Sequence, residues 1–346
     1  MVLPGGRCWR NFEPSFGPLI TIKLDHMSHS SFSIVFPGQG SQSVGMLSLL
    51  SAAFPLVQET FAEASESLGY DLWRLVQNGP GEDLNRTAIT QPAMLAAGVA
   101  VWRVWQAEGG ATPQMMAGHS LGEYTALVCA GAIGFADAVS LVADRGRFMQ
   151  EAVPAGSGAM AAILGLDDDQ VRKVCADAAQ GEVVEAVNFN SPGQVVIAGD
   201  KIAVDRACEL AKEAGAKRAL PLPVSVPSHC ALMQPAAERL SERLAGIAIV
   251  APNTPVLHNA NVDTATDPDA IRQLLAAQLY SPVRWVETVR KMAAAGVDTL
   301  YEAGPGKVLA GLTKRIDKNL KGVAVFDPDT LKAAMETIQA AMETIQ

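Results

Sequence analysis

Cysteine is scarce in this sequence. Its five residues are widely separated, with no C-x-x-C pair and no histidine at metal-ligand spacing from any of them. Disulfide frameworks and zinc sites use closer or regularly spaced cysteines, so we expect neither a disulfide framework nor a metal site. Aromatic residues are also few, at 5% of the chain, which argues against an aromatic-rich β-sandwich. The cysteines are Cys8, Cys129, Cys175, Cys208 and Cys230.

Long apolar runs and an excess of positive charge are missing as well. The longest nearly pure apolar segments end at Arg103 and Asp137, well short of the roughly 18 residues that a membrane span needs. The formal net charge is −9, which argues against general binding of nucleic acid. The first residues lack the continuous apolar stretch of a secretory signal. We therefore expect no membrane or nucleic-acid partner and a cytoplasmic location.

The composition that remains is typical of a globular protein. Hydrophobic residues make up 49% of the chain and charged residues 18%, and Ala, Val and Leu supply most of the apolar content. This balance favours layered α/β packing. A chain of 346 residues accommodates a single large domain or a domain with an insertion.

The two ends differ from the middle. Residues 1–26 contain several prolines and glycines without a sustained period, so we interpret them as a disordered or non-native extension. Residues 333–339 are repeated letter for letter as 340–346. Because two consecutive copies would continue one helix, we interpret 333–346 as a duplicated tail and not as a repeat architecture.

Strand and helix signals alternate between these ends. An apolar segment at 32–36 predicts a first strand, and a second strand near 114–117 leads directly into a glycine-rich turn and a helix. Pro92 suits a first helical turn and predicts the start of another helix. The alternation predicts an α/β core with a parallel sheet, made of residues 27–156 and 226–332.

The segment 157–225 has a different rhythm. Its pattern predicts strand, helix, strand, strand, helix and strand in that order. This βαββαβ order is the ferredoxin-like arrangement, which forms a compact unit of its own. We therefore expect a ferredoxin-like subdomain inserted into the main sheet.

The strongest local signal for chemistry is Gly118-x-Ser120-x-Gly122, placed between a predicted strand and a predicted helix. In a nucleophile elbow, glycines allow a sharp turn that exposes the serine hydroxyl, and the helix N-terminus offers N–H groups to an oxyanion. The alternative is a glycine-bounded turn with a helix-capping serine. The strand before and the helix after favour the elbow.

A nucleophilic serine needs a base, and few histidines qualify. Two of the five lie in the N-terminal segment, and His119 adjoins Ser120, where an elbow turns its side chain away from the hydroxyl. His258 ends an apolar strand and is interpreted as structural. His229 lies in a loop before a helix, which favours it as the general base.

An acid that would orient the imidazole does not stand out. The nearby aspartates follow His229 in the chain, whereas an elbow hydrolase has its acid between the serine and the histidine. This order counts against an ordinary esterase. A backbone carbonyl can also orient an imidazole, although it stabilises the imidazolium less than a carboxylate does.

Two further features bear on a substrate. Arg145 lies on the helix after the elbow, and its guanidinium could bind a substrate carboxylate in a bidentate fashion. A solvated surface arginine is the alternative. The glycine-bearing loop around Gln39, after the first strand, could bring a backbone N–H to the same oxyanion.

Six short segments stand out in order along the chain: FPGQGSQ at 36–42, TQPA at 90–93, GHSLGEY at 118–124, RGRFM at 145–149, NFNSPGQ at 188–194 and PSH at 227–229. Taken together, they resemble the malonyl-CoA:acyl-carrier-protein transacylase family of bacterial type II fatty acid synthesis. The resemblance extends in order over about residues 30–330. It implies an α/β-hydrolase-like core with a nucleophile elbow and a ferredoxin-like insertion.

The resemblance also implies a mechanism. Ser120 would be malonylated by malonyl-CoA with His229 as its general base, CoA would leave, and the phosphopantetheine thiol of acyl carrier protein would take the malonyl group. The main-chain carbonyl of Gln278 would orient His229. No cofactor is implied, because malonyl-CoA is a substrate and the partner carries the phosphopantetheine.

The remaining residues that the resemblance assigns concern the oxyanion and the acyl group. Gln39 and Leu121 would supply the oxyanion N–H groups. Arg145 would bind the free malonyl carboxylate, with Gln91 nearby. The resemblance thus implies that Arg145 binds substrate.

An acidic carrier protein would need a local basic patch on this acidic chain. Lys217 and Arg218, on the expected insertion, are candidates, and a solvated charged face is the alternative. Other functions stay open on sequence alone. They are a serine hydrolase or thioesterase, a polyketide-type acyltransferase, and a catalytically silent module that binds carrier protein or acyl-CoA.

Overall fold

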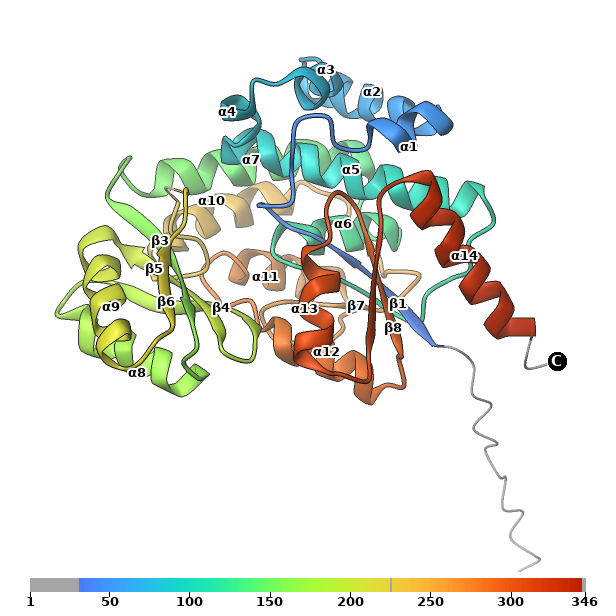
Figure 1. The fold of residues 1–346 in the computed structure, drawn as a ribbon. Coiled ribbons are helices and arrows are strands. Elements are labelled where there is room, and N and C mark those ends of the chain that lie inside the picture. The colour runs from blue at the N-terminus through green and yellow to red at the C-terminus, as the bar shows by residue number, and fades with distance from the viewer. Residues whose placement is uncertain (1–30, 225, 344–346) are drawn as a thin grey trace, which may run out of the picture.

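The structure is a computed structural model that describes residues 31–224 and 226–343. Figure 1 shows a larger lobe built around one sheet and, beside it, a smaller lobe with a sheet of its own. The expected N-terminal extension at 1–26 lies outside the described residues, as does Cys8.

The sheet of the larger lobe has five parallel strands in the order β7-β2-β1-β8-β9. In the register of the central strand, Ile34 lies opposite Met116 on one side and Tyr301 on the other. This confirms an α/β protein with a parallel sheet. The strands are β1 Phe32–Phe36, β2 Met116–Gly118, β7 Val256–Leu257, β8 Thr299–Ala303 and β9 Lys321–Val325.

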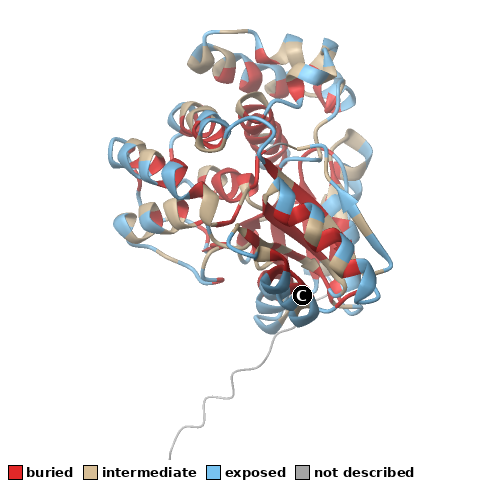
Figure 2. Cartoon of the chain, turned by 90° about the vertical axis from the view of Figure 1, so that its left-hand side faces the viewer, coloured by how far each residue is buried: buried red, intermediate tan, exposed pale blue. Residues whose placement is uncertain are grey.

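Both faces of this sheet are covered by helices, which explains why β1 is apolar throughout. Ile34 and Phe36 belong to a core on one face, whereas Val35 belongs to a core on the other. The alternation follows from the two-residue period of a strand. Figure 2 shows the resulting buried interior in red.

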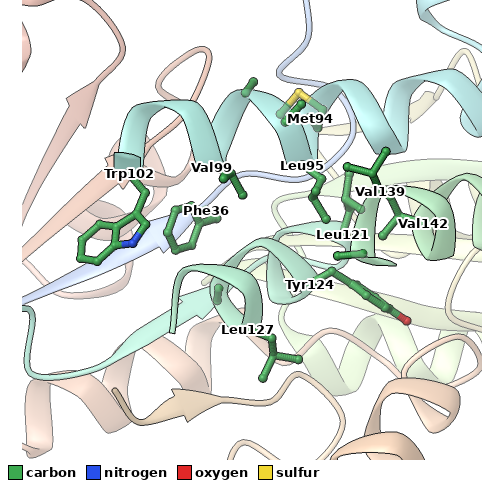
Figure 3. Packing of buried hydrophobic residues seen from close by; sticks show 14 of the residues in the cluster. Phe36, Met94, Leu95, Val99, Trp102, Leu121, Tyr124, Leu127, Val139 and Val142 are labelled. Atoms are coloured by element: carbon green, nitrogen blue, oxygen red, sulfur yellow. The ribbon is translucent and has the colours of Figure 1, made fainter. Parts of the chain in front are cut away.

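The core on the first face continues outward through most of the helices, and Figure 3 shows Phe36 among residues of three of them. The second face packs against α12 and α13. The helices that contribute buried residues to the core on the first face are α1 Ser48–Ala53, α2 Leu56–Leu68, α3 Leu72–Asn78, α4 Gly81–Leu84, α5 Thr87–Ala107, α6 Leu121–Cys129, α7 Phe135–Ala152, α10 Gln234–Ala245, α11 Pro268–Ala277 and α14 Pro328–Glu343. On the second face are α12 Trp285–Ala294 and α13 Val308–Ile316, and a short 3₁₀ helix spans Ala231–Met233.

Helix α5 corrects one expectation. The sequence predicts a helix that begins at Pro92, but α5 begins at Thr87 and Pro92 lies inside it. The preceding turn is held by close packing on α7, where a Cβ added at Gly146 would lie 2.7 Å from the Cα of Ala88. Tertiary packing therefore outweighs the loss of one helical hydrogen bond at the proline. The extra turn carries Gln91 into the interior.

The sheet of the smaller lobe has four antiparallel strands in the order β4-β5-β3-β6. Two helices cover one face and form a separate core with it. Val187 of β4 accepts a backbone hydrogen bond from Val283 of the larger lobe, at 2.8 Å, which ties the lobes together. The elements are β3 Gly158–Leu164, α8 Asp168–Ala179, β4 Val184–Ser191, β5 Gln194–Asp200, α9 Lys201–Glu213 and β6 Arg218–Pro221.

The C-terminal repeat begins inside an element of the fold. Helix α14 runs through position 333, and Ala334 and Ile338 of the first copy are buried in the core. None of the helices within the described residues is long and apolar enough to cross a membrane.

Candidate active site

The site is built on the turn between β2 and α6. Ser120 lies in this turn with φ 51° and ψ −108°, a strained conformation for a residue with a side chain. The turn depends on glycine at both flanks, since a Cβ at Gly118 would lie 1.8 Å from the carbonyl carbon of Gly122. A Cβ at Gly122 would in turn lie 2.1 Å from the oxygen of Phe36. The sequence therefore forms the sharp turn between strand and helix that the glycine spacing predicts.

The imidazole of His229 faces the serine. Its Nε2 lies 2.8 Å from the Oγ of Ser120, and its Nδ1 lies 2.8 Å from the main-chain oxygen of Gln278. Because a carbonyl only accepts, Nδ1 carries the proton and donates it to Gln278, which leaves Nε2 free to accept from the serine hydroxyl. The structure thus brings together the three residues that the resemblance connects.

The electrostatics of the site keep this imidazole neutral. His229 is buried, and burial together with the positive charge of Arg145 lowers its pKa to about 3. A neutral imidazole at neutral pH is the form that can take a proton from a hydroxyl. His119 points elsewhere, with its Nε2 2.8 Å from the Oδ1 of Asn190.

Arg145 lies in the interior, only 1% exposed, so the solvated-surface alternative is wrong. Its Nη1 donates to the Oε1 of Gln91 at 2.7 Å, and its Nη2 donates to the Oε1 of Gln278 at 3.0 Å. The same Nη2 lies 3.3 Å from the Oγ of Ser120. Within the described residues no carboxylate lies within ion-pair distance of this guanidinium. A buried cation beside the serine is therefore available to an anion that enters the site.

A cavity of about 250 Å³ opens above the serine, between the two lobes. Of the residues predicted for the site, it is lined by Gln39, Gln91, Ser120, Leu121, Arg145 and His229. The smaller lobe contributes Asn188, Asn190 and Gln194 to its wall, and α13 contributes Leu309 and Leu312.

Both oxyanion candidates line the cavity. Leu121 is the first residue of α6, so its N–H has no partner in the preceding helical turn. Gln39 lies in the loop after β1 and lines the same cavity.

Lys217 and Arg218, the candidates for carrier docking, are exposed on the smaller lobe and do not line the cavity.

Sequence reasoning missed two residues that hold the elbow. Asn259 accepts a hydrogen bond from the N–H of Ser120 at 2.8 Å and donates to the oxygen of Gly118 at 2.8 Å. Glu123 lies beneath them, fully buried. One signal was present for Glu123, which is the single charged residue of the apolar helix α6.

The described residues show no cluster of His, Cys, Asp or Glu that could hold a metal ion.

A strained serine that faces a buried imidazole, in a sharp turn at the end of a parallel strand, is an arrangement suited to forming an acyl-serine, and the class of enzyme is an acyltransferase. In agreement, the family model for the acyl transferase domain matches residues 33–341. Curated relatives narrow this class. The malonyl CoA-acyl carrier protein transacylase of Escherichia coli K12 is 63% identical over 307 residues, which cover 89% of this chain and 99% of the relative. That of Bacillus subtilis is 48% identical over 309 residues, 89% of this chain and 97% of the relative.

Solved structures agree with the curated relatives. An acyl carrier protein S-malonyltransferase from Vibrio cholerae has 65% identity and a TM-score of 0.87, and covers 88% of this chain and 100% of its own. A malonyl-transacylase in complex with a type II PKS acyl-carrier protein has 59% identity and a TM-score of 0.88, with coverages of 89% and 100%. The chain belongs to the malonyl CoA-acyl carrier protein transacylases.

Proposed function

We propose that this enzyme transfers a malonyl group from malonyl-CoA to the phosphopantetheine thiol of an acyl carrier protein, and so supplies malonyl groups for fatty acid synthesis. The observation that carries the proposal is the position of Arg145, whose Nη2 lies 3.3 Å from the Oγ of Ser120. In a malonyl group a single methylene separates the thioester carbonyl from the free carboxylate. A cation that binds this carboxylate must therefore lie beside the nucleophile.

In the first half-reaction, the Oγ of Ser120 attacks the thioester carbon of malonyl-CoA while the Nε2 of His229 takes its proton. The carbonyl oxygen becomes an oxyanion, which the N–H groups of Gln39 and Leu121 stabilise. The carbon–sulfur bond then breaks, and the imidazolium returns the proton to the CoA sulfur. Malonyl-Ser120 and free CoA result.

The second half-reaction repeats these steps with the other thiol. The Nε2 of His229 takes the proton of the phosphopantetheine thiol, and the sulfur attacks the ester carbon of malonyl-Ser120. The carbon–oxygen bond breaks and the proton returns to the serine oxygen. No redox change occurs, and both thiols take part as substrates, so the steps as written use no cofactor.

Arg145 supports malonyl over acetyl as the acyl group, and the partner of His229 supports transfer over hydrolysis. The carboxylate of a malonyl group would pair with the guanidinium of Arg145, and this pair would hold the group in one orientation. An acetyl group has no carboxylate and would leave the buried guanidinium unpaired. A hydrolase of elbow type uses a carboxylate to orient its histidine, whereas here the carbonyl of Gln278 has that position.

The carrier protein is proposed to dock over the mouth of the cavity. Lys217 and Arg218 are exposed on the smaller lobe, as a docking site for an acidic partner requires. A second pair of exposed cations, Lys314 and Arg315, lies on α13, which forms part of the cavity wall. Arg315 donates to the Oε1 of Gln194, a lining residue, at 2.7 Å. The acidic carrier would thus contact cations on both lobes.

The proposal extends to the fold and the location. A parallel sheet with a serine elbow supports an α/β-hydrolase-like core. The β4-β5-β3-β6 order, with two helices on one face, supports a ferredoxin-like subdomain. A cytoplasmic location fits an enzyme whose substrates are CoA and carrier-protein thioesters.

Two-substrate kinetics test the proposal. Initial rates are measured at several fixed concentrations of holo-acyl carrier protein while malonyl-CoA is varied. An acyl-enzyme cycle gives parallel lines in a double-reciprocal plot, because CoA leaves before the carrier enters. Lines that intersect would mean direct transfer in a ternary complex, and CoA release that never depends on carrier would mean a hydrolase.

A further inference from the structure

A buried carboxylate lies directly beneath the elbow. Glu123 is fully buried, and its Oε2 accepts hydrogen bonds from the N–H of Asn259 at 2.9 Å and from the Nε2 of Gln278 at 2.7 Å. Its Oε1 lies 2.7 Å from the Nδ1 of His258. No lysine or arginine among the described residues is within ion-pair distance of it. A carboxylate in such a place is costly to bury, so its hydrogen bonds deserve a functional explanation.

These bonds determine which way the amide of Gln278 points. Its Nε2 donates both to Glu123 and to the main-chain oxygen of Ser120, at 3.0 Å. Its Oε1 accepts from Arg145 at 3.0 Å. A flipped amide would turn its oxygen toward a carboxylate and a carbonyl, and its NH₂ toward a guanidinium. All three contacts would then be repulsive, so the contact with Glu123, together with those to Ser120 and Arg145, excludes the flipped state.

The amide of Gln278 in turn stands between the two buried charges. Glu123 attracts the guanidinium of Arg145 across this amide without contacting it. A carboxylate in direct contact would form an ion pair with Arg145 and compete with a substrate carboxylate. Because one neutral amide separates the two groups, Glu123 acts as a counter-charge and the guanidinium of Arg145 stays available to the malonyl group.

We propose that Glu123 is a positioning residue that sets the selectivity for malonyl over uncharged acyl groups, by fixing the amide of Gln278 and, through it, the guanidinium of Arg145. The inference rests on the proposed function. It assigns to the glutamate an effect on selectivity that passes mainly through the amide of Gln278, which contacts both charged groups.

A double-mutant cycle with Glu123→Gln, Gln278→Ala and their combination tests this chain of contacts. Gln278→Ala removes the amide but keeps the main-chain carbonyl that faces His229. Values of kcat/KM are measured with malonyl-CoA and with acetyl-CoA. We expect each single variant to lower the malonyl-to-acetyl ratio on the order of tenfold, and the double variant to be no worse than Gln278→Ala.

Glu302→Gln is the matched control. Glu302 is also a fully buried carboxylate, but its Oε2 accepts from the N–H of Ala310 at 2.8 Å and contacts none of the groups around Arg145. We expect this variant to keep the wild-type selectivity ratio. A general effect of losing a buried acid would lower the ratio in both variants alike.

Circular dichroism and thermal melts show whether Glu123→Gln folds. If it does not, a second variant that exchanges the acid and the amide keeps the proposal testable. In Glu123→Gln/Gln278→Glu, an acid and an amide still face each other, but the acid now contacts Arg145. We expect this variant to lose its preference for malonyl.

The outcomes separate the two proposals. Three results would overturn the role of Glu123. They are an unchanged malonyl-to-acetyl ratio in Glu123→Gln, a wild-type ratio in Glu123→Gln/Gln278→Glu, and single-variant effects that multiply in the double variant Glu123→Gln/Gln278→Ala. A wild-type enzyme that is not acylated by malonyl-CoA at all would instead overturn the proposed function.

Discussion

The main-chain oxygen of Gln278 lies 2.8 Å from the Nδ1 of His229, in the position where a serine triad has a carboxylate. A carbonyl fixes the tautomer and the ring orientation as a carboxylate does, but it carries no full negative charge. Buried beside Arg145, the imidazole therefore has a strongly lowered pKa, about 3. The site favours a neutral base, and the consequences are measurable.

The first prediction concerns the pH dependence of acylation. Because the pKa of His229 is lowered to about 3, the base stays unprotonated throughout the weakly acidic range. The rate at which malonyl-CoA acylates the enzyme should therefore show no loss from His229 protonation between pH 8 and about pH 5. Rapid-quench measurements across this range check it. A rate that halves near pH 6.5 contradicts it.

The second prediction concerns stability in acid. The folded pKa of His229 lies below the ordinary value, so the unfolded chain binds the proton more tightly, and the free energy of unfolding falls as the pH drops from about 6.5 toward 3. At pH 5 this cost is about 2 kcal/mol. His229→Gln has no such group and should lose less stability between pH 7.5 and pH 5. Urea unfolding of both proteins at the two pH values measures the difference, and equal losses count against the lowered pKa.

The third prediction concerns Arg145. Arg145→Ala should lower kcat/KM for malonyl-CoA at least about tenfold, because the malonyl carboxylate loses its partner, and should tolerate acetyl-CoA better. Arg145→Lys should not restore the activity, since an ammonium cannot hold Gln91 and Gln278 at once in the fork geometry. Unchanged malonyl kinetics in Arg145→Ala would remove the residue from this role.

The fourth prediction concerns the elbow. Gly122→Ala places a Cβ 2.1 Å from the oxygen of Phe36, so the backbone of the turn must shift. We expect a loss of about 1–3 kcal/mol in the free energy of unfolding, together with loss of acylation. Gly311→Ala, on α13 with no neighbour within 4 Å, is the control and should be neutral or slightly stabilising. Equal free energies of unfolding for Gly122→Ala and Gly311→Ala would show that the turn accepts a Cβ beside the oxygen of Phe36, and would contradict the prediction.

The fifth prediction concerns carrier docking. Reversing the charge of Lys217 and Arg218, or of Lys314 and Arg315, should raise the KM for acyl carrier protein by roughly severalfold and leave acylation by malonyl-CoA unchanged. The α13 pair should have the larger effect, since it is nearer the cavity. The increase should shrink as salt is added. Identical KM values in wild type and both variants would place the carrier elsewhere.

Features that depend on neighbours in the sequence were predictable. The elbow is one, because Gly118 packs against the backbone of Gly122 within the same five-residue segment. The parallel sheet is another, since strands covered on both faces are apolar throughout. Strand β9 gave no such signal, because it lies at the edge of the sheet and begins with the exposed Lys321.

Features that depend on distant contacts were not predictable from local pattern. Gln278 is 49 positions from His229, and only the family resemblance connected them. Asn259 meets Ser120 across 139 positions. Pro92 shows the same limit, since its local preference for a first turn yields to packing of α5 on α7.

Intact mass spectrometry of the enzyme after incubation with malonyl-CoA tests the central claim most directly. The account predicts a single malonyl adduct that is absent in Ser120→Ala, persists in buffer, and moves to holo-acyl carrier protein when that protein is added. An adduct that forms equally in Ser120→Ala, or one that is lost to water before any carrier is added, would contradict transfer through malonyl-Ser120.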